Sequence, residues 1–138
     1  MDKEYMTSLW ERAVRTLENA KANLQLLPDT AANRAYYAVF FAVSALFASE
    51  GKLFKKHSGV RSAVHKELIN TGRWSDSLGD DYDMLIDLRE VADYGVLKHA
   101  GMEEAVAAIN AAERILRAVH EARPDIFPLD VSPADESL

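Results

Sequence analysis

The sequence of 138 residues contains no cysteine and only four prolines, three of which lie after residue 123. The lack of cysteine excludes disulfide bonds, thiolate metal sites and cysteine nucleophiles, and it is compatible with a reducing compartment. The first residues, MDKEYMTSLWER, carry charges where a signal peptide would need an apolar core. We therefore expect a cytoplasmic protein.

Basic residues are also scarce, with 16 Lys and Arg against 22 Asp and Glu and a formal net charge of −6. This balance argues against a large electrostatic footprint for nucleic acid, because phosphate binding depends on clustered basic side chains. The charges are unevenly distributed. Residues 51–66 contain basic residues and no acid, whereas Arg89 is the only basic residue in the strongly acidic segment 76–93. The protein should have a basic side and an acidic side.

Strand patterns and internal repeats are absent, and apolar residues recur at helical spacing instead. We expect Thr30 and Ser58 to cap the second and third helices, and Gly51 and Gly72 to end them. The sequence predicts an all-α fold, an antiparallel up-and-down bundle of four to five helices over residues 1–123. Residues 124–138 should form an extended or disordered tail. The expected helices cover residues 6–27, 30–50, 57–71, 76–94 and 103–123.

The second of these helices has an apolar run from Ala35 to Leu46 that is interrupted only by Ser44. A helix that is apolar all round is either fully buried or shared with a partner, and this run is too short to span a bilayer. We expect a central helix or a dimer helix, with Tyr36, Phe40 and Phe41 in the core.

The acids of the fourth helix indicate which of its faces is exposed. They recur at steps of four and three and should form one solvated ridge. A solvated face is favoured over a divalent-cation site, because no histidine accompanies these acids. The opposite, inward face then carries Arg89, whose charge must be paired or used. Arg89 can pair with Asp93 on the same face, or offer its planar fork to a phosphate in a solvated groove. The ridge consists of Asp76, Asp80, Asp83, Asp87 and Glu90.

Two further positions favour a half-solvated groove. Arg34 and Tyr37 share one face of the second helix, and a phenol beside a guanidinium suits such a groove. His57 begins an HSGV turn at the start of the third helix, where backbone N–H groups could hold an anion. His65 and His120 are interpreted as surface residues without a role.

Taken in order, ANRAYYAVFFAVSALFASEG, KKHSGV and LREVADYG resemble the prokaryotic HEPN-domain family, in the UPF0332-like branch with an R-x-Y-Y-A-x-F motif. The resemblance implies a helical bundle, often a homodimer, and frequent pairing with a small MNT-type nucleotidyltransferase in toxin–antitoxin modules. Many members are metal-independent endoribonucleases, and others are thought to bind nucleotides or partner proteins.

The family's nuclease motif is an arginine, then four to six residues of any type, then a histidine that acts as base. Arg89 matches the arginine, but Tyr94 stands at the histidine position, and tyrosine is a poor base at neutral pH. The leading hypothesis is therefore a module, without cofactor or metal, that binds a nucleotide or RNA phosphate or docks a nucleotidyltransferase. A metal-independent endoribonuclease, with Arg89 as a catalytic residue and His57 or His99 as the base, is the alternative, and a structural bundle is the third hypothesis. The expected groove contains Arg34, Tyr37, His57, Arg89, Asp93 and Tyr94.

Overall fold

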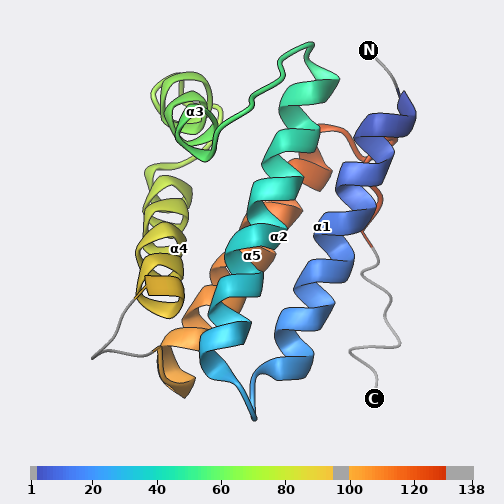
Figure 1. The fold of residues 1–138 in the computed structure, drawn as a ribbon. Helices are drawn as coiled ribbons and strands as arrows, with labels where there is room; N and C mark the ends of the chain where they lie inside the picture. The colour runs from blue at the N-terminus through green and yellow to red at the C-terminus, as the bar shows by residue number, and fades with distance from the viewer. Residues whose placement is uncertain (1–2, 95–99, 130–138) are drawn as a thin grey trace.

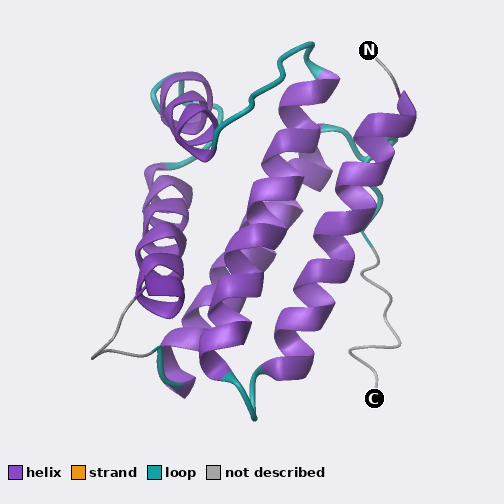
Figure 2. Cartoon of the chain, viewed as in Figure 1, coloured by secondary structure: helices purple, strands orange, loops and turns teal. Residues whose placement is uncertain are grey.

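The computed structural model describes residues 3–94 and 100–129, apart from the side chains of residues 91–94. Within these ranges the chain is helical and contains no strand, which confirms the predicted all-α bundle (Figure 1, Figure 2). The long helices alternate in direction, as an up-and-down bundle requires. The elements are α1 (Lys3–Asn23), α2 (Pro28–Ser49), α3 (His57–Ala63), the π-helix η1 (Val64–Ile69), α4 (Asp76–Tyr94) and α5 (Met102–Ala122).

Helix α2 is the centre of the bundle and packs against α1, α4 and α5 (Figure 1). By length and composition alone it could cross a membrane, but 67% of its most apolar window is buried inside the protein. Val39, Val43 and Leu46 are completely buried. The apolar run is thus explained by packing on several sides, and the prediction of a central helix is confirmed.

The starts of α2 and α3 differ from those predicted. Helix α2 begins at Pro28, with Leu27 as the N-cap, and Thr30 lies inside the helix. Proline suits the first helical position because its missing N–H would have no partner there and its φ is already helical. Helix α3 has Lys56 as its N-cap without a side-chain capping bond, so Ser58 does not cap it either.

The predicted helix ends are confirmed at Gly51 and Gly72, which have φ values of +81° and +82°. The left-handed conformation costs glycine little because it has no Cβ. The predicted third helix consists of two parts, because the α-helix α3 is followed directly by the π-helix η1. Val60, Val64 and Leu68 form its buried face, as their spacing indicated.

Helix α4 exposes the face that its acids predicted to be exposed, and it has the expected bounds. Tyr82 and Leu85 are completely buried, while Asp76, Asp80 and Asp87 are exposed. One member of the ridge is not simply solvated. Asp83 accepts a hydrogen bond from His65 Nε2 at 2.9 Å and pairs with Arg61 at 3.3 Å. The acidic and basic segments therefore meet, and His65, to which the sequence assigned no role, joins them.

The residues that follow α5 pack against the bundle. Phe127 is completely buried, with its ring centroid 5.4 Å from that of Trp10. Trp10 Nε1 donates to the Pro128 carbonyl at 2.7 Å, and His120 Nδ1 lies 2.7 Å from the Phe127 carbonyl. Packing thus continues past the boundary expected at residue 123, at least to residue 129. Residues 130–138 of the expected tail lie outside the described part of the chain.

Candidate functional site

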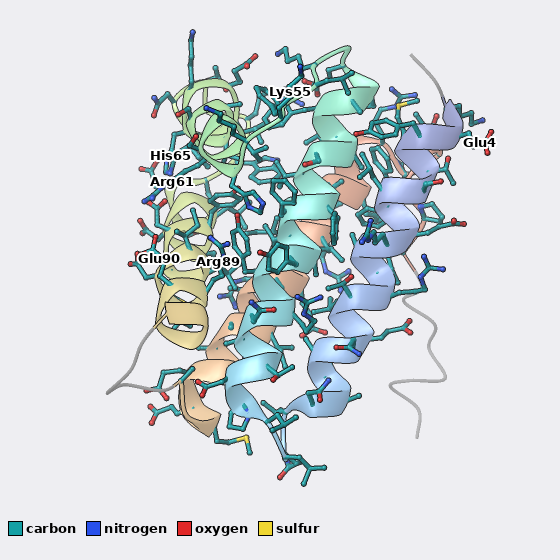
Figure 3. The ribbon with its side chains drawn as sticks, in the orientation of Figure 1. Glu4, Lys55, Arg61, His65, Arg89 and Glu90 are labelled. Carbon is teal, nitrogen blue, oxygen red and sulfur yellow. The ribbon has the colours of Figure 1, made fainter. Side chains whose placement is uncertain are left out.

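Arg89 reaches from α4 toward α2, whereas the neighbouring Glu90 faces away from the bundle (Figure 3). Its Nη2 donates to the Tyr37 hydroxyl at 3.2 Å. Its guanidinium carbon lies 5.4 Å from the Tyr36 ring centroid and 5.6 Å from that of Tyr37. Arg89 is half-buried, as its place on the inner face of α4 predicted. The positive charge is held against two aromatic rings, a favourable arrangement for a guanidinium.

His57, the first residue of α3, contacts the same two tyrosines. The Tyr36 hydroxyl lies 2.6 Å from His57 Nδ1, and the Tyr37 ring meets the imidazole edge-on with centroids 5.7 Å apart. Phe40 stacks on the imidazole with centroids 4.0 Å apart and an angle of 7° between the rings. The histidine side chain is therefore held by two tyrosines that Arg89 also contacts, although His57 and Arg89 are 32 positions apart in the sequence.

The protonation states in this cluster follow from burial and from the charge of Arg89. Burial raises the pKa of Tyr36 to about 12, so its hydroxyl keeps its proton at neutral pH. Burial, and then the positive charge of Arg89, lower the pKa of His57 below its ordinary value, which leaves the imidazole neutral.

These states assign the tautomer of His57. The only acceptor that the described residues offer to the Tyr36 hydroxyl is Nδ1 of His57. We therefore assign Tyr36 as the donor to Nδ1, which places the imidazole proton on Nε2. His57 in this form has Nε2–H as its donor, and it lies close enough to Arg89 for that charge to lower the pKa of the imidazole.

Arg34 extends the cluster along α2. Its Nε and Nη2 both donate to Oδ1 of Asn33, at 2.9 and 2.7 Å, and its guanidinium carbon lies 5.0 Å from the Tyr37 ring centroid. Tyr37 therefore lies against two guanidinium groups, those of Arg34 and Arg89, and also against the imidazole of His57. We name these four residues, with Tyr36 and Phe40, the Arg89 cluster.

The structure thus brings together Arg34, Tyr37, His57 and Arg89 of the expected groove. The side chains of Asp93 and Tyr94, and all of His99, lie outside the described residues. The sequence indicated only a core role for Tyr36 and Phe40. Both side chains pack in the core. Tyr36 also fixes the tautomer of His57, and Phe40 fixes the plane of the imidazole ring. Their spacing from Tyr37 on one helix was visible in the sequence, whereas their contact with residue 57 was not.

Two of the backbone N–H groups near the start of α3 are not available to an anion. The N–H groups of Gly59 and Val60 are already bonded to the Lys56 carbonyl, at 3.1 and 3.3 Å. The contacts that link His57 to the cluster are made by its side chain. Among the described residues, no group of three or more His, Asp or Glu side chains is placed to hold a metal ion.

The guanidinium of Arg89, the imidazole N–H of His57 and the hydroxyl of Tyr37 lie on a half-buried surface. Together they can bind an anion with two negatively charged oxygens, such as a phosphate. The protein is therefore an all-α helical bundle with a cluster of basic and aromatic side chains between its helices. Comparison with known proteins then gives the family.

The model of the HEPN domain matches residues 6–122. A UPF0332 protein of Thermotoga maritima is 36% identical over 127 residues, which are 91% of this chain and 96% of the relative. A protein of Methanocaldococcus jannaschii named "Putative toxin MJ0142" is 34% identical over 105 residues, 75% of this chain and 71% of that protein. The crystal structure of TT1696 from Thermus thermophilus superposes with a TM-score of 0.70 at 21% identity, over 84% of this chain and 96% of that one, and shows the same fold.

The chain belongs to the HEPN-domain family, and its similarity to the UPF0332 proteins agrees with the branch that its motifs indicated.

Proposed function

We propose that the protein is a HEPN module that binds an RNA or nucleotide phosphate at the Arg89 cluster, in a toxin–antitoxin-like system. The observation that carries the proposal is the convergence of Arg89 and His57 on Tyr36 and Tyr37 from two different helices. The guanidinium of Arg89 supplies the positive charge, and Nε2–H of His57 supplies a hydrogen-bond donor of fixed direction. The relative named as a toxin supports the wider setting.

The tautomer of His57 favours binding over cleavage. A general base toward a 2′-hydroxyl needs a free imidazole lone pair, and the lone pair on Nδ1 already accepts from Tyr36. If the proton moved to Nδ1, the part-buried Tyr36 hydroxyl would lose this acceptor, which is unfavourable. The neutral imidazole is thus held as a donor.

Calorimetric titration with ATP, GTP and a short single-stranded RNA tests the binding function. We expect binding of at least one of these ligands by the wild type and a loss of about tenfold or more in affinity for Arg89→Ala, since a charge-assisted hydrogen bond contributes about 1.5–3 kcal/mol. Arg117→Ala is the matched control, because Arg117 is an exposed arginine on α5 outside the cluster. No heat with any of the three ligands would reject the proposal.

A metal-independent endoribonuclease is the second candidate, favoured by the position of His57 beside Arg89. It requires His57 to replace the histidine of the family motif, at whose place this sequence has Tyr94. Incubation of RNA with the wild type, Arg89→Ala and His57→Asn in EDTA separates the two functions. Cleavage by the wild type that both substitutions abolish would establish the nuclease, whereas intact RNA with retained binding supports the module.

We further propose a nucleotidyltransferase of the MNT type as the partner protein. Membership of the HEPN family and similarity to the relative named as a toxin support this pairing. Affinity capture of the protein, co-expressed with an MNT-type nucleotidyltransferase of the same organism, tests it. A stable complex is expected, and separate elution of the two proteins would reject the pairing.

A homodimer is the oligomeric state that we propose for the isolated protein, again by similarity to the family. Sedimentation equilibrium over a range of concentrations tests it. The expected mass is twice the 15.4 kDa of the chain, and a monomer at all concentrations would contradict the proposal.

A further inference from the structure

A second cationic site lies between α1 and α2, next to the Arg89 cluster. A cavity of about 300 Å³ is present there, and its lining contains three arginines and no acidic residue. Arg12 and Arg15 are one turn apart on α1, and Arg34 comes from α2. The lining consists of Arg12, Arg15, Thr16, Asn19 and Arg34.

The arginines of this cavity are not neutralised within the part of the chain that the structure describes. Arg12, Arg15 and Arg34 have no carboxylate partner among the described residues. The acidic chain does supply such partners elsewhere: other arginines form ion pairs with carboxylates, namely Arg61 with Asp83, Arg73 with Glu50, Arg114 with Asp81 and Arg123 with Asp125. Because no carboxylate of the described residues pairs with them, the three guanidinium groups around this cavity create a local positive potential within the described part of an acidic chain.

Aromatic rings of α2 hold two of these guanidinium groups in place. The carbon of the Arg12 guanidinium lies 4.6 Å from the Phe41 ring centroid, and that of Arg34 lies 5.0 Å from the Tyr37 ring centroid. Cations positioned in this way lose less side-chain entropy when a ligand binds. The cavity is therefore partly organised for an anion before binding.

The cavity and the Arg89 cluster are neighbours. Arg34 lines the cavity, and both Arg34 and Arg89 contact the ring of Tyr37, with guanidinium carbons 5.0 and 5.6 Å from its centroid. A ligand with a single phosphate can occupy only one of the two sites. A single-stranded nucleic acid has regularly spaced phosphates, with bases that stack on exposed aromatic rings.

We propose that the cavity of Arg12, Arg15 and Arg34 is a second phosphate site and that the ligand of the protein is a single-stranded RNA rather than a mononucleotide. One phosphate binds at Arg89 and another phosphate of the same strand binds in the cavity. This inference rests on the proposed function of the Arg89 cluster.

Titration of a labelled single-stranded RNA octamer and of AMP into the wild type and into the Arg12→Ala/Arg15→Ala double variant tests the inference. The wild type should bind the octamer at least tenfold more tightly than AMP. The double variant should bind the octamer about tenfold more weakly, and its affinity for AMP should be unchanged. The plot of log affinity against log salt should become flatter by about 0.7 for each phosphate that the variant no longer neutralises.

Two further variants make the result specific. Arg15→Ala removes an exposed side chain that lines the cavity, and it should weaken octamer binding without affecting the fold, as circular dichroism would show. Arg117→Ala removes one positive charge outside the cavity and should leave the affinity and the salt slope unchanged.

The outcomes separate the two proposals. If Arg89→Ala weakens octamer binding but the double variant binds with wild-type affinity and salt slope, the second site is rejected and the proposed function stands. Equal affinities of the wild type for AMP and octamer would also reject the second site. If the wild type binds neither ligand, both proposals fail.

Discussion

The Tyr36 hydroxyl and His57 Nδ1 lie 2.6 Å apart, although 21 residues separate them in the sequence. This hydrogen bond connects the central helix α2 to the first residue of α3. With Phe40 stacked on the ring, it fixes both the orientation of the imidazole and the nitrogen that carries its proton. The chemistry available at His57 is therefore decided by a residue of the core.

Tyr36→Phe should remove this hydrogen bond and retain the packing of the ring. Because a donor to Nδ1 stabilises the neutral imidazole, its loss should raise the pKa of His57. Titration of the imidazole C–H signals by NMR measures the change. Tyr37→Phe, whose hydroxyl bonds to Arg89 instead, is the control. Superimposable His57 titrations in the wild type and Tyr36→Phe would refute the assigned hydrogen bond.

The lowered pKa of His57 should make folding stability depend on pH. The unfolded chain takes up a proton near the ordinary histidine pKa of about 6.5, whereas folded His57 takes it up only at lower pH. The free energy of unfolding should thus fall as the pH drops below about 6.5. Urea unfolding at several pH values should show a smaller fall for His57→Gln than for the wild type. Parallel curves for the two proteins would contradict the shift.

Arg89→Ala should have only a modest effect on stability. The arginine is half-buried against Tyr36 and Tyr37, and a cation–π contact of this kind contributes roughly 1 kcal/mol. Urea unfolding of the variant at neutral pH measures the loss. A loss of about 3–5 kcal/mol would instead indicate a buried structural ion pair and would favour the purely structural bundle.

Phe127→Ala should destabilise the protein strongly, because the ring is completely buried against Trp10. Removal of a buried phenylalanine costs about 3–5 kcal/mol. Leu26, which is 85% exposed, is the control, and Leu26→Ala should change stability by less than about 0.5 kcal/mol. Thermal unfolding compares the two. Equal midpoints would show that residues after α5 are not part of the bundle.

The sequence predicted most of the bundle because helix phase depends on local periodicity. The acids of α4 face solvent on one side, so they placed Arg89 inward without any knowledge of its neighbours. The glycines at 51 and 72 ended helices for an equally local reason. The helix starts were predicted less well, since Pro28 began α2 two residues before the polar residue chosen as its cap.

The contacts of the site could not be read from periodicity. Which residues meet His57 depends on the path of the chain between α2 and α3, and no spacing rule gives that path. Phe127 was missed for a similar reason, because proline and acid content indicated a tail while its burial depends on a space beside Trp10. The arginine cavity joins two helices, so Arg12 and Arg15 were visible only as residues on the surface of an amphipathic helix.

Whether Arg89 and His57 bind the same phosphate, as proposed, is tested most directly by a double-mutant cycle on RNA affinity. The affinity of one short single-stranded RNA is measured at fixed salt for the wild type, Arg89→Ala, His57→Ala and the double variant. If both residues contact one phosphate, the loss in the double variant should be smaller than the sum of the single losses, with a coupling of at least about 0.5 kcal/mol. Additive losses, or no loss in either single variant, would contradict the claim.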